Sequence, residues 1–385
     1  MKYLFVLVLS FVLTAGTALP VHAVQRRDTL QAGNHLAEVI ELIMVRYAGD
    51  PVTVGDLVEA AMRGMTELLD EYSIYLSAAE LAQFTNSLSG QLVGIGISMS
   101  AREDGRIEIV RVLPGSPAEA AGVVPGDLLI SVDGQRVVGW GLNEITSLIT
   151  NRDNERVIVS FDRNGRILTF DILKEEIRSP TVIVERLHHL PEADGLNGLQ
   201  DFRYMQISTV GLTTGRDVQL ALSQMQNEGV QGIILDLRGN TGGYLEVAVE
   251  IANLMVPRGI VLQTVSRSGR RYTYSSLLEE VPFDNVVVLV NRFTASAAEA
   301  IAAALQDSDA AVIIGEPTFG KGLVQSVYGI RTGGALMLTT EEYFRRNGEA
   351  INGVGVIPNV LVERSPDGQD QVLHRGLEVL LQGGF

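Results

Sequence analysis

The chain has 385 residues, 46% of them hydrophobic, and carries 46 acidic against 30 basic side chains, a formal net charge of −16. A chain this acidic repels nucleic acid and anionic lipid surfaces, so nucleic-acid binding is not expected. The absence of cysteine excludes a disulfide framework, thiol catalysis and a cysteine-linked lipid anchor. At this length and apolar content we expect two or three domains, each stabilised by its own core.

Residues 1–23 have the pattern of an export signal. Lys2 is followed by an uncharged apolar stretch from Tyr3 to Leu19 and then by Val-His-Ala, which predicts a cut after Ala23. An uncleaved membrane anchor is the alternative, because the apolar stretch is close to the shortest length that spans a bilayer. We therefore expect an exported protein that is periplasmic, extracellular or membrane-tethered, with its folded domains outside the cytoplasm.

Residues 24–88 are predicted to form an N-terminal helical segment. Its first half has apolar residues at helical spacing, namely Leu36, Val39, Ile40, Ile43 and Met44. A second patterned stretch runs from Val54 to Leu69. The pattern alone is typical of a helical pair that packs on its own domain.

Residues 89–175 form the second predicted unit. The stretch from Leu92 to Met99 reads LVGIGISM, two glycines followed by a strand. Downstream, PGSPAEAAGVVPGDLLISVDGQRV predicts a short helix closed by Gly122, then a strand and a turn. A further helix has one apolar face, formed by Leu142, Ile145, Leu148 and Ile149. That face could wall a groove beside the first strand.

This complete pattern resembles a PDZ domain of the bacterial protease type, although a Gly-x-Gly alone is usually only a flexible turn. The resemblance implies that a peptide adds to the unit as a strand. Its terminal carboxylate would be held by backbone amides of the glycine loop, which comprises Gly94, Ile95, Gly96 and Ile97.

The third unit, residues 176–365, alternates strands and helices. A buried strand, Gly232 to Leu237, runs into the turn RGNTGG and a helix from Tyr244 to Met255. Several N–H groups at such a turn can form an oxyanion hole. Phosphate or dinucleotide binding is the alternative, but the turn lacks the G-x-G-x-x-G order and the acidic residue about 20 positions later.

Ser296 lies between the apolar strand Val286 to Val290 and an Ala-rich helix from Ala297 to Leu305. Its hydroxyl is thus expected at the positive end of a helix dipole. Lys321 follows 25 residues later, after one helix and one strand, in a Gly-rich turn. This order suits a Ser–Lys nucleophile and base pair, whereas the ordinary interpretation is a helix cap and a solvated lysine.

Two other chemistries are disfavoured at this pair. No His lies between residues 190 and 373, so a Ser–His pair is excluded within this segment. The stretch from Gly315 to Lys321 fits most of a phosphate-binding loop, G-x-x-x-x-G-K. However, Gly322 stands where a Ser or Thr hydroxyl should hold magnesium.

The segments TASAAE, GEPTFGKGLVQ and LDLRGNTGG, with their order and spacing, resemble the signatures of the C-terminal processing peptidases, or tail-specific proteases. The resemblance implies that Ser296 is the nucleophile, Lys321 the general base and Gln325 the residue that orients the lysine. It also implies that Gly242 and Ala297 donate the oxyanion-hole amides. Neither a metal nor another cofactor is required.

A lysine base must be neutral to accept a proton, so burial has to lower its pKa from about 10.4. A glutamine can position the amine without adding a negative charge that would raise that pKa. Gln325 is therefore a chemically sensible partner for Lys321.

The implied fold is an α/β protease core with a mixed sheet and flanking helices, and a PDZ-like domain inserted after the N-terminal helical segment. Residues 366–385 are assigned to a C-terminal tail. The implied partners are polypeptides with accessible C-terminal tails, a second copy of the chain bound through the N-terminal helices, and a regulatory protein.

The chain departs from the family pattern at a few positions. Glu71 replaces the Pro of an LDPxSxYL motif, a change that we expect to affect a turn rather than chemistry. Ala298 replaces a frequent Ser, and Arg345 and Arg346 stand where a Pro is common; these changes are expected to affect substrate contacts.

Two other function classes remain open. One is a catalytically silent scaffold that binds peptides through the PDZ-like groove. The other is a nucleotide-dependent enzyme that uses the loop at Lys321.

Overall fold

The computed structural model describes residues 23–89, 91–102, 104–113, 115–151, 154–178, 180–193, 196–331, 333–362 and 370–383. The predicted export signal lies outside these residues, apart from Ala23. None of the helices in the described segments is long and apolar enough to cross a membrane.

The chain divides into two compact units. Of the described residues, those within 1–85, 184–210 and 214–385 form the core unit, and those within 86–183 and 211–213 form the inserted unit. The inserted unit is longer at both ends than the predicted 89–175. At its C-terminal end the extension includes β9 (Glu175–Arg178), which pairs antiparallel with β2 (Gln91–Gly94).

The core unit contains a six-stranded sheet in the order β10-β11-β12-β15-β16-β19. Its strands are β10 (Val182–Arg186), β11 (Phe202–Ile207), β12 (Gly232–Asp236), β15 (Asn285–Val290), β16 (Val312–Gly315) and β19 (Val360–Leu361). The pairs from β11 to β19 are parallel. β12 and β15 are almost continuously apolar, as strands covered on both faces are.

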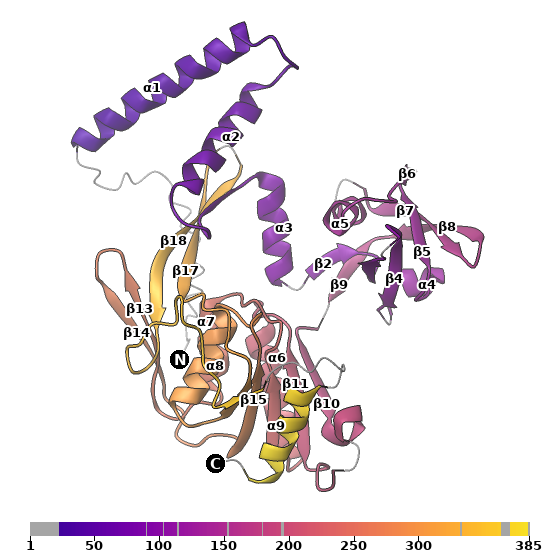
Figure 1. Ribbon diagram of the computed structural model, residues 1–385, viewed down its shortest axis with the longest axis vertical. Helices are drawn as coiled ribbons and strands as arrows, with labels where there is room; N and C mark the ends of the chain where they lie inside the picture. The colour runs from indigo at the N-terminus through magenta and orange to yellow at the C-terminus, as the bar shows by residue number, and fades with distance from the viewer. Residues whose placement is uncertain are drawn as a thin grey trace, which may run out of the picture. The chain divides into compact units, whose positions relative to one another are not determined.

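Helices cover this sheet (Figure 1). They are α6 (Thr214–Asn227), α7 (Leu245–Asn253), α8 (Ala297–Asp307) and α9 (Gln371–Leu381). α7 packs against both α6 and α8. α9 packs on β12, β15 and β16, where Gly376 lets it lie directly on Val287 and Leu289.

A second, antiparallel sheet in the core unit brings distant segments together. Its order is β1 (Ile74–Leu76), β18 (Ala335–Phe344), β13 (Gly259–Ser266) and β14 (Arg271–Ser276), and β17 (Leu323–Gly329) also pairs with β18. Ile74 lies opposite Met337 in this sheet. The core is therefore α/β with a mixed arrangement of strands, as predicted.

The N-terminal segment is helical, as predicted, with α1 (Ala23–Arg46), α2 (Val54–Glu67) and α3 (Ala78–Ser89). α2 begins at a capping box in which Thr53 and Asp56 bond reciprocally. Arg63 on α2 bonds Glu80 on α3. Many apolar side chains of α1 and α2 are exposed, among them Leu36, Val39, Leu42, Val45 and Met65.

The assignment of residues 366–385 to a tail was wrong for residues 371–381, which form α9. Val372, Leu373, Leu377 and Leu380 lie at helical spacing and are buried in the core cluster that also contains Ile234 and Leu289. The Asp370 carboxylate accepts the N–H of Leu373 and caps the helix.

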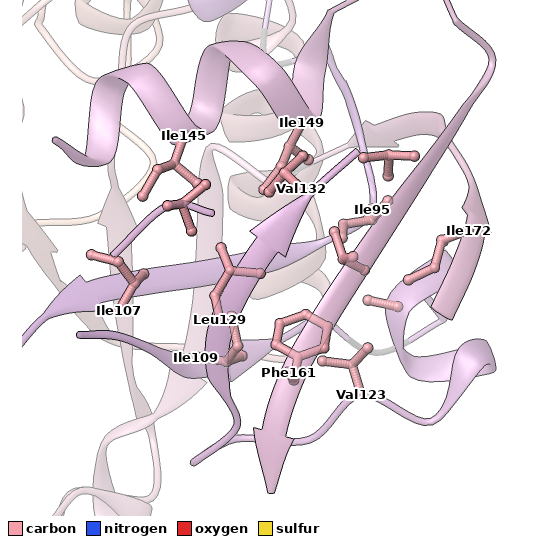
Figure 2. Close-up of a cluster of buried hydrophobic side chains, with 14 residues drawn as sticks. Ile95, Ile107, Ile109, Val123, Leu129, Val132, Ile145, Ile149, Phe161 and Ile172 are labelled. Atoms are coloured by element: carbon pink, nitrogen blue, oxygen red, sulfur yellow. The ribbon is translucent and has the colours of Figure 1, made fainter. Parts of the chain in front are cut away.

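The inserted unit contains a six-stranded sheet in the order β3-β4-β5-β7-β8, with β6 (Gln135–Arg136) beside β5. Its other strands are β3 (Ile97–Ala101), β4 (Ile107–Val112), β5 (Leu128–Val132), β7 (Arg156–Arg163) and β8 (Arg166–Leu173). Two helices, α4 (Pro117–Ala121) and α5 (Leu142–Thr150), complete it. Its core gathers Ile95, Ile109, Leu129, Ile145 and Phe161 from all parts of the unit (Figure 2).

Candidate active site

Ser296 occupies a sharp turn between β15 and α8. Its backbone angles, φ 54° and ψ −124°, are rare for a residue with a side chain and imply local strain. The turn is held from outside, because Ala295 N–H donates to Asn240 O at 2.9 Å and the Thr294 hydroxyl donates to Leu237 O at 2.9 Å. A serine on a strained strand-to-helix turn is typical of an exposed nucleophile.

The glycine-rich turn lies directly against this serine. A Cβ on Gly242 would stand 2.8 Å from Ser296 Cβ and 2.9 Å from Ala297 N, so only glycine fits at its φ of 100°. The two predicted oxyanion donors are therefore neighbours. The Ala297 N–H has no hydrogen-bond partner among the described residues, whereas the Gly242 N–H donates to Asn240 Oδ1 at 2.9 Å. The oxyanion assignment stays a prediction, and Gly242 could act only after releasing Asn240.

Glu299 ties the two predicted catalytic residues together. This side chain is fully buried, and one of its oxygens accepts the N–H groups of both Ser296 and Lys321 at 2.8 Å. The other oxygen accepts the Thr318 hydroxyl and the Gly320 N–H. The carboxylate thus fixes the end of β15 relative to the Gly-rich turn after β16.

Tyr343 makes the complementary connection. Its buried hydroxyl lies 2.7 Å from Ser296 O and 2.6 Å from Lys321 O, so its single proton is shared between two carbonyls. Burial raises the pKa of Tyr343, which keeps the hydroxyl protonated as a donor. Ser296 and Lys321 are therefore held through both their N–H and their C=O groups.

The Lys321 amine is half-buried, and this burial lowers its pKa. The negative charges of Asp70, Glu299 and Glu71 partly offset that effect. Nζ stands 4.6 Å from the centre of the Tyr72 ring, a cation–π distance. Its lowered pKa suits a lysine that must give up its proton to act as a base.

Gln325 lies on β17, four residues after Lys321. Its Nε2 is 3.5 Å from the Thr339 hydroxyl on β18. Among the described residues, no hydrogen bond joins Lys321 Nζ to either Ser296 Oγ or Gln325. The structure thus holds the three residues on adjoining backbone segments, and catalysis would require the lysine side chain to reach the serine hydroxyl.

The predicted carboxylate loop lies in the inserted unit at the start of the edge strand β3. Its carbonyls are occupied, because Ile95 O accepts Ala118 N–H and Gly96 O accepts Leu113 N–H. The N–H groups of Ile95 and Gly96 donate to no described residue. Gly96 has a φ of 82°, a conformation that favours glycine. Gly94 ends β2 and Ile97 begins β3, so all four predicted residues lie at this one turn.

The helix predicted beside the first strand of this unit is α5, and the groove between them stays a prediction. Among the described strands, β3 pairs with β4 alone, which leaves its other edge open for a further strand. α5 packs against β3. Partly buried apolar side chains line the margin of the core on both elements, namely Ile97, Met99, Leu142 and Leu148.

Comparison with known proteins agrees with this geometry. Residues 201–362 match peptidase family S41, and residues 108–163 match a PDZ domain. The carboxyl-terminal-processing protease of Picosynechococcus is 31% identical over 331 residues, which cover 85% of this chain and 78% of that protein. The chain belongs to peptidase family S41.

Other family S41 proteins are similar over most of the chain. The carboxy-terminal processing protease CtpA of Bacillus subtilis is 34% identical over 309 residues, which span 80% of this chain but 64% of CtpA. The solved structure of a photosystem II D1 C-terminal processing protease has 29% identity and a TM-score of 0.52, covering 84% of this chain and 86% of that one. A putative S41 protease from Bacteroides fragilis, at 16% identity and a TM-score of 0.55, shares the fold.

Sequence reasoning missed two residues of the candidate site. Glu299 was visible as a Glu three residues after Ser296, the spacing of a capping box, and it does accept the Ser296 N–H. Nothing in the sequence pointed to the Tyr343 hydroxyl. At the departures from the family pattern, Ala298 is buried in α8 and Arg345 pairs with Asp307, so in this structure these two side chains pack and bond internally.

Proposed function

We propose that this chain is an exported serine endopeptidase that captures the C-terminal tails of polypeptides in its PDZ domain and cleaves with Ser296 and Lys321. The observation that carries the assignment is the Glu299 carboxylate, which accepts the main-chain N–H of both residues. A serine cap and a solvated lysine would need no such shared anchor. The proposed processes are regulated proteolysis or protein processing.

Acylation would begin with a neutral Lys321. Its amine takes the proton of Ser296 Oγ as that oxygen attacks the scissile carbonyl. The resulting tetrahedral anion lies beside the free N–H of Ala297, and Gly242 adds a second donor once it has released Asn240. The ammonium then protonates the leaving amine, and water hydrolyses the acyl-enzyme with the lysine again as the base.

Gln325 would orient the amine during this cycle. Among the described residues Lys321 makes no hydrogen bond to Ser296 or Gln325, which supports a resting state as part of this proposal. Binding of substrate, or of a regulatory protein, would bring the amine into contact with the hydroxyl.

The exposed apolar side chains of α1 and α2 support a homodimer built through these helices. The open edge of β3 and the free N–H groups of Ile95 and Gly96 support capture of an extended tail. Export rests on the signal pattern of residues 1–23 in the sequence.

The test compares residues 24–385 with the Ser296→Ala and Lys321→Ala variants. Each is incubated with an unfolded protein that has an apolar C-terminal tail, in chelator and without nucleotide, and the products are identified by mass spectrometry. We expect cleavage by the parent alone. Cleavage that persists in Ser296→Ala would contradict the assignment. Tail binding without cleavage by any variant, even with candidate regulators added, would favour the scaffold function.

A further inference from the structure

The segment that follows α2 reaches the candidate active site. Asp70 accepts the N–H groups of Tyr72 and Ser73, at 2.9 and 2.8 Å, and the Ser73 hydroxyl at 2.8 Å. The Ser73 Oγ in turn accepts the N–H of Thr339 on β18 at 3.0 Å. This compact turn, residues 69–73, is therefore fixed to the strand that pairs with the Gln325-bearing β17.

The turn places an aromatic ring on the catalytic lysine. Lys321 Nζ is 4.6 Å from the centre of the Tyr72 ring, within the range in which an ammonium is attracted to the ring face. In the segments that the structure describes, Nζ makes no hydrogen bond. The contact with this ring therefore favours the observed position of the amine.

The same turn determines which way the Gln325 amide faces. The Thr339 hydroxyl donates to Asp70 Oδ1 at 3.1 Å, because a carboxylate can only accept. With its proton used, that hydroxyl can only accept from Gln325, and Nε2 is the atom that faces it at 3.5 Å. The carbonyl oxygen of Gln325 is thereby left for the lysine amine.

We propose that residues 69–73 form part of the active site, with Tyr72 holding the Lys321 amine and Asp70 orienting the Gln325 amide through Thr339. The proposal rests on the assignment of Lys321 as the base. Both residues act through another side chain, so they are positioning residues. Their contacts are strongest once Lys321 has taken the serine proton, when the ring and the carboxylates stabilise the new ammonium.

The charged and titratable groups around Lys321 come from two elements besides its own. The turn supplies Asp70, Glu71 and Tyr72, and α8 supplies Glu299. The expectation that Glu71 affects a turn stays a prediction, and its carboxylate is also one of the three that raise the pKa of Lys321 against the effect of burial. A Pro at this position would remove that charge.

The chain offers a direct measurement. It has three lysines, Lys2, Lys174 and Lys321, and only two of them remain in residues 24–385. Selective isotope labelling of lysine would therefore give two ε-carbon NMR signals, assigned with Lys174→Arg. Titrating Lys321 in a Ser296→Ala background requires no turnover, so the result does not depend on whether the enzyme is active.

We expect Tyr72→Leu and Glu71→Gln each to lower the pKa of Lys321, by about half a pH unit for loss of the ring. Tyr72→Phe keeps the ring and should stay close to the parent. Glu67→Gln, a charge removal at the end of α2, should leave the Lys321 titration unchanged. An unaltered titration in correctly folded Tyr72→Leu would overturn the Tyr72 part of the proposal.

The proposed orientation of the Gln325 amide is tested in the active enzyme with two matched variants of neighbouring threonines on β18. Thr339→Val removes the hydroxyl that faces Gln325, whereas Thr340→Val removes a hydroxyl that bonds Ser326 instead. We expect Thr339→Val to lower kcat about tenfold with little change in KM, and Thr340→Val to behave as the parent. Equal kcat in both variants would overturn this part, whereas cleavage by Ser296→Ala would instead overturn the proposed function.

Discussion

Asp127 in the inserted unit and Glu299 in the core unit are both fully buried carboxylates, and the two are stabilised by different partners. In the inserted unit, the Asp127 carboxylate accepts hydrogen bonds from Nε and Nη2 of Arg163, at 2.6 and 2.7 Å, and from the Val124 N–H at 3.0 Å. In the core unit, Glu299 accepts only main-chain N–H groups and one hydroxyl.

The difference follows from what each carboxylate holds. The Asp127–Arg163 pair closes β5 onto β7 and needs only to be satisfied within the fold. Glu299 holds the segments of Ser296 and Lys321, the proposed nucleophile and base, and its charge also raises the pKa of Lys321. A cationic partner would cancel that charge and occupy the oxygens that hold the catalytic backbone.

The largest effect should come from Glu299→Gln. The amide keeps the shape, but its NH₂ end would face two N–H or O–H donors and leave them unsatisfied, at about 1–3 kcal/mol each. We expect kcat to fall at least about 100-fold, since a displacement of about 1 Å at reacting groups can cost that much. Single-turnover cleavage measures it.

Glu246→Gln is the matched control, because Glu246 is an exposed acid in the first turn of α7. Its kcat should equal that of the parent. A Glu299→Gln enzyme within threefold of the parent would show that the carboxylate is only structural.

Asp127→Asn should lower the stability of the inserted unit. The Arg163 pair and the Val124 N–H outweigh the effect of burial and hold the pKa of Asp127 below its usual range. Its contribution to stability is therefore present above the unfolded-state pKa of about 3.9 and is lost as pH falls through the lower folded-state value. The variant should destabilise the inserted unit by about 1–3 kcal/mol at neutral pH.

Hydrogen exchange of residues 86–183 measures this change. As the pH falls below about 4, the amides of this unit in the parent should lose protection from hydrogen exchange, whereas those in Asp127→Asn should change less. Cleavage of a short peptide without a C-terminal carboxylate should be unaffected at neutral pH. If the parent and Asp127→Asn are equally stable at neutral pH, the Asp127–Arg163 ion pair makes no net contribution to the stability of the inserted unit.

The helices, strands and turns that could be predicted from the sequence are those whose pattern lies within one continuous stretch of residues. The apolar run Val286 to Val290 and the Ala-rich stretch after Ser296 gave a buried strand and a helix, because period and propensity are local properties. The glycine-rich turn and the inserted unit followed for the same reason. α9 also has apolar residues at helical spacing, so this helix is a local property of the sequence as well.

The remaining parts depend on contacts between distant segments. Asp70 meets Thr339 only because β1 pairs with β18, and Tyr343 reaches Ser296 and Lys321 only after β18 has packed against the turns that carry them. Antiparallel pairing of segments so far apart leaves no periodic signal in the sequence. Glu299 is intermediate, because its bond to Ser296 is local and its bond to Lys321 is not.

The groove of the inserted unit should show a smaller effect that is confined to tailed substrates. Ile97→Ser removes an apolar side chain at the start of β3, where the tail is expected to add. We expect about tenfold weaker binding of an apolar C-terminal peptide, from the loss of roughly 1–2 kcal/mol of apolar contact. Fluorescence anisotropy with a labelled peptide measures it.

Ile167→Ser is the control, because Ile167 is 72% exposed on β8. Its peptide affinity should match that of the parent. If both variants bind the peptide as the parent does, the tail is captured elsewhere and the β3 edge is not the groove.

The smallest effect on kcat should come from Tyr343→Phe in the core unit. The variant removes the shared hydroxyl from the carbonyls of Ser296 and Lys321 but leaves both N–H groups on Glu299. A loss of about 1 kcal/mol in positioning corresponds to roughly a fivefold lower kcat. Tyr272→Phe, at an exposed tyrosine, is the control. A larger loss in Tyr343→Phe than in Glu299→Gln would mean that the carbonyl side, rather than the carboxylate, aligns the nucleophile with the base.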